Sequence, residues 1–407
     1  MSILARYLSS FSGLPRSAWL LAAVLLVNTS GTMVVFFMSL YLARHLGWPQ
    51  ELAGFGMSAY GAGMLAGTLT GGVLADRLGA FRIQRLSLTA SGLLLLTISF
   101  LRGFSPVLGA LVLWGFCASA LYPSNAAAMA AVCPPAVRAR GFVLNRLAAN
   151  LGATIGPLVG GFLAQHDYRL LFWVDGVTCL LAAAASLWFF PGSRPEPAVP
   201  GGAAQHPEID WWRDRIFLGV LAVTLGIALV FSQLFSTFGM YLKESAGLPE
   251  SRIGGLVAVN TGFIVLVQMP LTHATDRFSR TRLTAIGALL LGAGFALTPW
   301  GNSLSYLAAT VIVWTFGEML TLPLLTTLTS LRASSAAQGK YQGLFTMSYS
   351  MGVTVGPALG TWVYTAFGGR TLWMAVGAVG TAAAAGMFAL SRRWDGRTAA
   401  FPPPGAL

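Results

Sequence analysis

Residues 150–161 read NLGATIGPLVGG, and residues 350–361, which lie 200 positions later, read SMGVTVGPALGT. Both segments contain Gly-x-Thr-x-Gly-Pro-x-x-Gly at the same relative positions. The same offset aligns further residues: Tyr41 with Tyr241, Gly47 with Gly247, Asp76 with Asp276, Arg77 with Arg277, Trp114 with Trp314, Pro123 with Pro323 and Trp173 with Trp373. Because such residues rarely recur at one spacing by chance, the sequence indicates an internal duplication that divides the chain into two halves.

The composition excludes a soluble protein. The chain has 407 residues, of which 55% are hydrophobic and 9% are charged, whereas soluble domains carry roughly a quarter charged residues. An aromatic content of 12% also excludes a disordered chain. The three cysteines and four histidines are scattered, so neither a metal site nor a disulfide framework is predicted. The sequence contains no P-loop, which argues against an intrinsic ATPase. We therefore expect an all-α integral membrane protein.

The apolar segments predict twelve membrane spans, since a helix needs about 17–25 residues to cross a bilayer. The predicted spans are 18–43, 51–75, 86–101, 106–132, 141–165, 170–190, 216–242, 250–275, 283–299, 304–331, 341–367 and 371–391. Lysine and arginine residues predict their orientation. With both termini in the cytoplasm, eighteen basic residues fall on inner segments and six on outer loops. The net charge of +12 therefore reflects topology rather than nucleic-acid binding.

The polar stretch 191–214 divides the chain near its middle, and its Pro and Gly residues exclude a continuous helix. Trp211 and Trp212 beside Arg213 are predicted to anchor it at the membrane interface. The expected domains are an N-terminal six-helix bundle (1–190), a cytoplasmic linker (191–214), a C-terminal six-helix bundle (215–392) and a cytoplasmic tail (393–407). Six spans per half give both halves the same orientation. A pseudo-two-fold axis along the membrane normal, with a substrate path between the halves, favours a transporter.

Two motifs resemble those of a known family. Gly72, Asp76, Arg77 and Gly79 match the cytoplasmic-loop signature G-x-L-A-D-R-x-G-R-[RK] of the major facilitator superfamily, although Ala80 replaces its basic residue. Gly152, Gly156, Pro157, Gly160 and Gly161 match G-x-x-x-G-P-x-x-G-G, the fifth-helix motif of its antiporters. The chain thus resembles the twelve-span drug:proton antiporter branch. This resemblance implies two pseudo-symmetric six-helix bundles and a monomer in the cytoplasmic membrane that exports small molecules. The proton gradient would drive it, without a cofactor.

Each motif also has a purely structural interpretation. Asp76 could accept hydrogen bonds from a neighbouring helix N-terminus and latch one conformation, or it could lie in a solvated turn. The second copy, at Asp276 and Arg277, is expected to latch more weakly because Thr272 and Ser279 replace glycines. The glycines at every fourth position let a neighbouring backbone approach closely. This packing pattern recurs in the second half at Gly352, Gly356, Pro357 and Gly360, so it is weak evidence for export.

Glu318 is the strongest candidate for a proton site. It lies well inside the tenth predicted span, where an ionised acid costs about 2.5–3.5 kcal/mol on insertion scales. Similar multidrug exporters carry a functional acid in the context G-E-x-x-x-x-P, which Gly317, Glu318 and Pro323 match. The alternative is an acid that stays protonated and hydrogen-bonds a neighbour.

Three further polar residues have two interpretations each. Asp175, near the outer edge of the sixth span, is either a second proton site or a structural cap. Arg146 and Asn150 share one face of the fifth span, where Arg146 either faces the interior or snorkels to the cytoplasmic edge. The fourth span lacks the arginine that many antiporters of this branch carry, which shifts weight to Glu318.

The remaining candidates are polar, aromatic or Met residues inside spans that could line a substrate cavity: Asn28, Thr29, Gln233, Asn260, Gln268, Tyr60, Tyr122, Phe36, Trp314 and Met319. Each aromatic could instead pack in the core or contact lipid. The expected function is proton-coupled export of amphipathic small molecules. Two alternatives stay open: a specific transporter of a siderophore, sugar or lipid-like anion, and a membrane receptor without transport activity.

Overall fold

The computed structural model describes residues 13–134, 137–191, 211–275, 277–333 and 337–398. Asp276, most of the predicted linker and part of the predicted tail lie outside the described residues. All regular secondary structure within these ranges is helical. The all-α fold class predicted from composition is therefore confirmed.

Helices of the first half alternate direction through one bundle. They are α2 (Arg16–Gly31), α3 (Val34–Leu40), the short π-helix η1 (Tyr41–His45), α4 (Gln50–Leu78), α5 (Ala80–Ile98), α6 (Phe104–Val132), α7 (Arg138–His166) and α8 (Arg169–Phe189). Gly79 joins α4 to α5 with φ +94°, a conformation that only glycine adopts freely. This accounts for the last glycine of the predicted loop signature.

The second half repeats this order. It comprises the 3₁₀ turn η2 (Trp211–Arg213), α9 (Arg215–Ser232), η3 (Gln233–Phe235), α10 (Thr237–Glu244), α11 (Glu250–Thr275), α12 (Arg280–Leu297), η4 (Thr298–Trp300), α13 (Leu304–Arg332), α14 (Gln338–Phe367) and α15 (Gly369–Thr398). The bounds of α13 are those of α6 displaced by 200 residues. Gly47 and Gly247 also share a positive φ, of 71° and 67°. The structure thus confirms the duplication at the level of elements and backbone turns.

The described helices give the twelve predicted segments when α2–α3–η1 and α9–η3–α10 each count as one. Nine helical segments within the described residues are long and apolar enough to cross a membrane. The other three are α4, α5 and α14, and α4 and α14 pack against each other at the junction of the halves. Helices that face another part of the protein need less lipid-compatible surface, which accounts for the lower hydropathy of α4 and α14.

The first and seventh predicted spans are each divided into shorter helices. The first is interrupted between Gly31 and Val34, and the seventh between Ser232 and Thr237. Both breaks fall in short runs of Ser, Thr, Gly or Gln, whose side chains offer the backbone alternative hydrogen bonds. At the second break the Gln233 amide donates to Gly356 O (3.0 Å) and accepts from Thr237 Oγ1 (2.8 Å). Interrupted spans in transporters occur where the backbone is buried in protein or lines a cavity.

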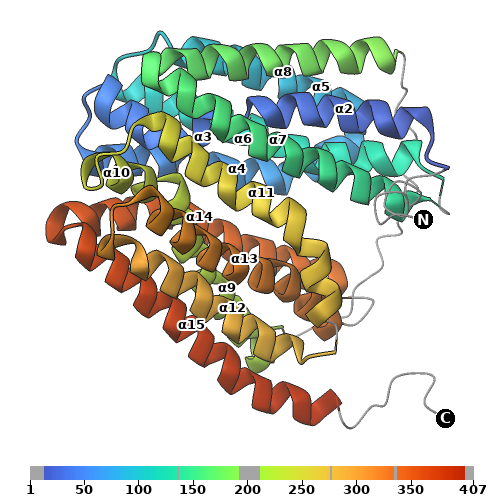
Figure 1. Ribbon diagram of the computed structural model, residues 1–407. Helices are drawn as coiled ribbons and strands as arrows, with labels where there is room; N and C mark the ends of the chain where they lie inside the picture. Colours follow the sequence, from blue (N-terminus) through green and yellow to red (C-terminus); the bar gives the residue numbers. More distant parts are fainter. Residues whose placement is uncertain (1–12, 135–136, 192–210, 276, 334–336, 399–407) are drawn as a thin grey trace, which may run out of the picture.

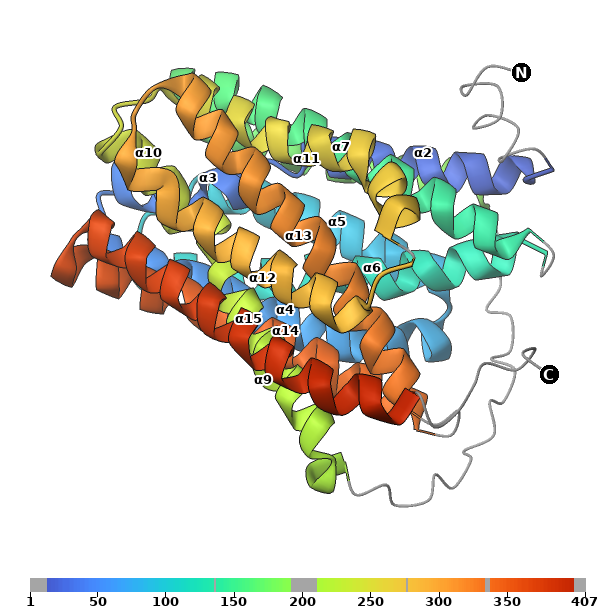
Figure 2. The same cartoon turned by 60° about the horizontal axis from the view of Figure 1, so that its bottom comes forward.

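The two bundles meet at one end of the molecule. They converge around α3 and α10 and diverge toward the end where α2 begins and α15 ends (Figures 1 and 2). Helix α4 packs against α14, and α7 packs against α11. These two contacts are related by the duplication, which is the arrangement expected of pseudo-symmetric halves.

Glycines of the fifth-span motif pack on two sides of α7. A Cβ at Gly152 would lie 2.0 Å from Thr29 Oγ1, and one at Gly160 would lie 2.7 Å from Met33 Cβ, so this face packs on the first span. A Cβ at Gly161 would lie 2.6 Å from the carbonyl oxygen of Glu250, so this position packs on α11 of the other half. The motif therefore brings backbones together both within a half and across the junction.

The second copy of the motif, on α14, likewise packs on two sides of its helix. Gly352, Gly356 and Gly360 pack on Ala228, Ser232 and Gln233 of the seventh span. Thr361 replaces the fifth residue of the motif, and its side chain fills the space beside Gly54 of α4.

Candidate functional site

Glu318 lies in the middle of α13 and is joined to α11. Asn260 Nδ2 donates to Glu318 Oε2 at 2.8 Å and to Thr315 Oγ1 at 3.0 Å. Asn260 is only 2% exposed, and Tyr349 of α14 lies close enough to interact electrostatically with the Glu318 carboxylate. Two residues separated by 58 positions thus form one polar site inside the second half. The Glu318 carboxyl group thus has one amide donor, and among the described residues no basic side chain pairs with it.

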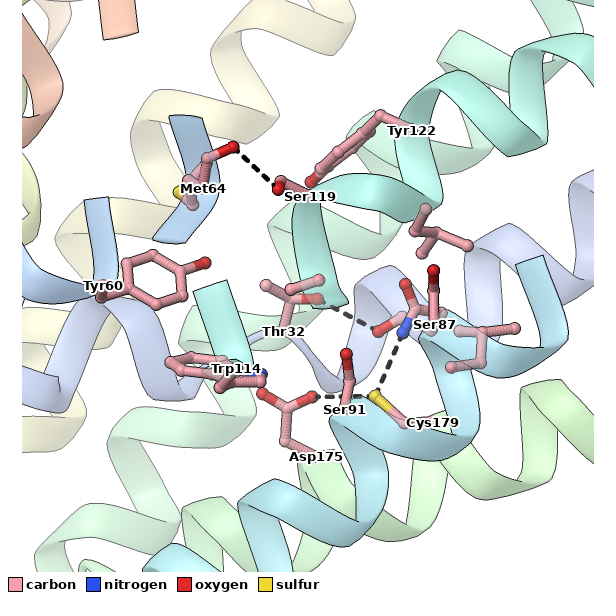
Figure 3. A pocket seen from close by; sticks show the side chains of 14 residues that line it. Thr32, Tyr60, Met64, Ser87, Ser91, Trp114, Ser119, Tyr122, Asp175 and Cys179 are labelled. Carbon is pink, nitrogen blue, oxygen red and sulfur yellow. Dashed lines mark hydrogen bonds between the residues drawn. The ribbon is translucent and has the colours of Figure 1, made fainter. Parts of the chain in front are cut away.

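A second polar site lies in the first half, around Asp175 of α8 (Figure 3). It surrounds a cavity of about 50 Å³, into which side chains of α2, α4, α5, α6 and α8 project. Asp175 is 2% exposed. Its Oδ1 accepts from Cys179 Sγ (3.7 Å), whereas its buried Oδ2 has no hydrogen-bond partner among the described residues. Asp175 therefore borders the cavity with one carboxylate oxygen unpaired.

Residues predicted to line one cavity are distributed among several places. Asn28, Tyr60 and Tyr122 border the cavity beside Asp175, and the Asn28 amide donates to Cys179 Sγ at 3.2 Å. Gln268 and Met319 border another cavity of about 200 Å³ at the predicted cytoplasmic side of the second half, together with Arg280. No described cavity joins these groups.

Three other candidates occupy packing positions. Trp314 is fully buried and stacks on Phe295 with ring centroids 5.0 Å apart. Phe36 contacts Phe235 across the junction of the halves at 5.4 Å. Thr29 donates to Leu25 O (2.8 Å) and lies against Gly152. For these residues the structure shows the packing role that the sequence left open.

Arg146 and Asn150 share a face of α7, as their spacing predicts. Arg146 is exposed, and among the described residues no acidic side chain pairs with it. Asn150 is half-buried, and its backbone carbonyl oxygen accepts from Thr154 Oγ1 at 2.9 Å.

The proposed latch residues Asp76 and Arg77 are exposed at the end of α4. Within the described part of the chain no hydrogen bond or ion pair holds the Asp76 side chain. Arg277 is exposed in the second copy, where its guanidinium lies 5.3 Å from the Phe278 ring.

The junction at the predicted outer end carries polar contacts that sequence reasoning did not identify. Glu244 of α10 accepts from Arg44 (3.3 Å) and from Gln50 Nε2 (2.5 Å) of the other half. Glu250 at the start of α11 accepts from Tyr168 of the other half (2.7 Å) and from Lys243 (2.9 Å). Hydrogen bonds between halves therefore close this end of the molecule.

Sequence reasoning also missed several residues of the Asp175 cavity. Ser87 and Ser91 of α5, Ser119 of α6 and Cys179 of α8 border it. A detectable signal was present for two of them, since Ser87 and Ser91 are four residues apart and so lie on one face of a helix.

Comparison with known proteins identifies the family. A model of the Major Facilitator Superfamily matches residues 20–347 and 216–405, which together span most of the chain. The chain belongs to this superfamily. It is thus a multi-pass membrane protein of a transporter family, as the loop signature and the duplication predicted.

Curated relatives are similar at low identity. The uncharacterized MFS-type transporter YttB of Bacillus subtilis (strain 168) is 24% identical over 370 residues, covering 88% of this chain and 91% of the relative. The multidrug resistance protein MdtH of Yersinia enterocolitica is 24% identical over 375 residues, covering 88% and 90%.

Solved structures share the fold. A peptide transporter POT in complex with sulfate superposes with a TM-score of 0.79 at 18% identity, covering 94% of this chain and 96% of that one. A nucleoside transporter, NupG, superposes with a TM-score of 0.77 at 14% identity, covering 92% and 100%. At such identities these likenesses concern the fold alone.

Proposed function

We propose that this superfamily member is a proton-coupled exporter of amphipathic small molecules, acting as a monomer in the cytoplasmic membrane. The observation that carries the proposal is the Glu318–Asn260 pair, an acid in the middle of a span with one amide donor. An acid inside a membrane span is costly and marks an ion or proton pathway in many transporters. The similarity to the multidrug resistance protein MdtH supports the substrate class.

The transport cycle follows from the arrangement of the halves. Hydrogen bonds close the predicted outer end, and the bundles diverge toward the predicted cytoplasmic end (Figure 1). In this state Glu318 would release its proton to the cytoplasm and substrate would bind. Opening of the outer end would then let a proton from outside replace the substrate. Asp76, which is exposed in this state, would latch the opposite one.

The test is substrate-driven proton movement in proteoliposomes. Glu318→Gln keeps the size of the side chain and its ability to accept from Asn260, but cannot carry a proton. We expect it to abolish the pH change that accompanies addition of a cationic dye, while dye binding to the purified protein remains. The matched control is Asp167→Asn. It changes an exposed acid that directly follows α7 in the other half, and it should behave like the wild type. Unchanged coupling in Glu318→Gln would contradict the proton role.

Arg146 supports a second candidate function. Arg146 lies on α7, is exposed and has no acidic partner among the described residues. Such an arginine would suit an anionic substrate. A specific transporter of an anionic metabolite would lose transport in Arg146→Gln and would not bind cationic dyes. Competition between cationic dyes and anionic metabolites for binding to the wild type separates the two functions.

A further inference from the structure

The cavity beside Asp175 holds a buried acid without a basic partner. Fourteen residues border it, and none of them is Lys, Arg or His. The titratable groups that face the carboxylate are Tyr60, Tyr122 and Cys179. Asp175 Oδ2 is buried and has no hydrogen-bond partner in the part of the chain that the structure describes. An ionised carboxylate is costly to bury without a partner for its charge. Asp175 therefore either binds a proton or requires a cation beside it in the cavity.

The oxygens around the cavity suit a cation better than an anion. Ser91 is 4% exposed, and its Oγ likewise has no partner. Thr32 and Ser119 donate their hydroxyl hydrogens to the backbone carbonyls of Asn28 (3.2 Å) and Met64 (2.9 Å). A hydroxyl that donates to a backbone carbonyl can offer only its lone pairs to a ligand. Hard cations prefer such oxygen ligands, as they prefer carboxylates.

The size of the cavity limits the ligand. A volume of about 50 Å³ exceeds the 10–15 Å³ that one water needs, so a few waters or one partly hydrated small ion would fit. It is much too small for a drug-sized molecule, which occupies pockets of about 300–1,000 Å³.

The duplication shows that the polar lining of the Asp175 cavity is specific to the first half. Four polar positions of the cavity align, at the offset of 200, with apolar residues of the second half: Asn28 with Ala228, Ser91 with Leu291, Asp175 with Ala375 and Cys179 with Val379. Glu318 in turn aligns with Ala118. The two acids are therefore not copies of one ancestral site, and each half carries its own.

We propose that the Asp175 cavity binds one small monovalent cation, either Na⁺ or a hydronium ion. Asp175 supplies the compensating charge, and Ser91 and the neighbouring hydroxyls supply oxygen ligands. Thr32, which lies in the break between α2 and α3, borders the same cavity, so occupancy of the site is linked to the break in the first span. The proposal stands independently of the Glu318 mechanism, because no residue is shared between the two sites.

Thermal unfolding of the purified protein in lipid nanodiscs tests the proposal. NaCl would be titrated against choline chloride at constant ionic strength, at one acidic and one alkaline pH. A sodium site predicts a saturable rise in Tm with Na⁺ that weakens in acid, and a hydronium site predicts a rise in Tm with acid alone. Asp175→Asn should abolish either response, and Ser91→Ala should weaken the affinity by about tenfold.

The controls separate this site from the proposed transport mechanism. Glu318→Gln should keep the Tm response of the wild type, whereas Asp175→Asn loses it. If Asp175→Asn does not fold, Ser91→Ala carries the test, because it removes only a hydroxyl. Absence of any saturable response to Na⁺ or acid in Glu318→Gln, or a full response in Ser91→Ala, would overturn the cation site.

Discussion

Asp214 connects three segments at the predicted cytoplasmic end of the second half. It accepts from the Phe217 N–H of α9 (3.2 Å), from Arg332 Nε of α13 (2.7 Å) and from the Tyr341 hydroxyl of α14 (3.2 Å). Partial burial favours the neutral acid, but the hydrogen bonds and the Arg332 charge outweigh it and hold the pKa of Asp214 below its ordinary value. The ionised side chain therefore stabilises the fold.

We expect Asp214→Asn to destabilise the protein by about 1–3 kcal/mol at neutral pH, because hydrogen bonds to a charged group are lost. A pKa that is lowered by folding means that this stabilisation is present above the ordinary Asp pKa, about 3.9, and is lost as the pH falls through the lower folded value. The difference in Tm between wild type and variant should hence be constant from pH 8 to about 5 and shrink in stronger acid. A Tm difference that grew in acid would contradict this role.

Single residues show how far sequence reasoning reaches at this scale. Glu318 and Asn260 were both identifiable, because a polar side chain in an apolar span is conspicuous. Their hydrogen bond was not predictable, since nothing in the sequence specifies which faces of α11 and α13 meet. Ser91 was missed because serine is tolerated at many packed helix positions, and only the unpaired carboxylate beside it makes it significant.

At the scale of elements, the contact between α7 and α11 depends on two glycines from different halves. A Cβ at Gly254 would lie 2.1 Å from the carbonyl oxygen of Pro157 and 3.0 Å from Gly161 Cα. Both neighbours are backbone atoms, so they cannot move aside as a flexible side chain would. Gly255, the next residue, has open space around its Cβ position.

Gly254→Ala should therefore separate α7 from α11, at a cost of about 1–3 kcal/mol to the state that is closed at the outer end. The measurement is the distance between spin labels at Ser105→Cys and Ser305→Cys, two exposed positions at the starts of α6 and α13. We expect the population with the shorter distance to fall by about tenfold relative to the other. Gly255→Ala is the matched control and should leave the distances unchanged; equal effects of the two substitutions would contradict the packing role.

The interrupted spans mark the limit of prediction for elements. Hydropathy located all twelve segments, with ends that differ from those of the helices by up to seven residues, because an apolar run has to cover the lipid-facing length of a helix. It could not locate the break after Gly31, since the residues around it remain apolar enough for a span. Thr32, inside the break, borders the same cavity as Asp175, which is distant in sequence, so the surroundings of the break could not be predicted from the residues near it.

At the scale of the whole molecule, the duplication yields a symmetric scaffold with asymmetric chemistry. The outer half of the second bundle is filled by an aromatic stack in which Phe295 lies between Trp314 and Trp373, at 5.0 and 5.7 Å. In the first bundle Trp114, which aligns with Trp314, instead borders the cavity beside Asp175. The two halves therefore surround their buried acids differently: Asp175 borders a small polar cavity in the first half, and Glu318 pairs with Asn260 in the second.

Tyr168 of the first half donates across the junction to the buried Glu250 of the second half. Tyr168→Phe removes this hydrogen bond and leaves the ring, so it should weaken the outer closure by about 1 kcal/mol or more and shift the population roughly fivefold toward the open state. The spin-label pair on α6 and α13 measures the shift. Tyr306→Phe is the matched control, because the Tyr306 hydroxyl donates to Leu297 O (2.7 Å) within one half. An equal shift in both variants, or none in Tyr168→Phe, would show that Glu250 does not hold the halves together.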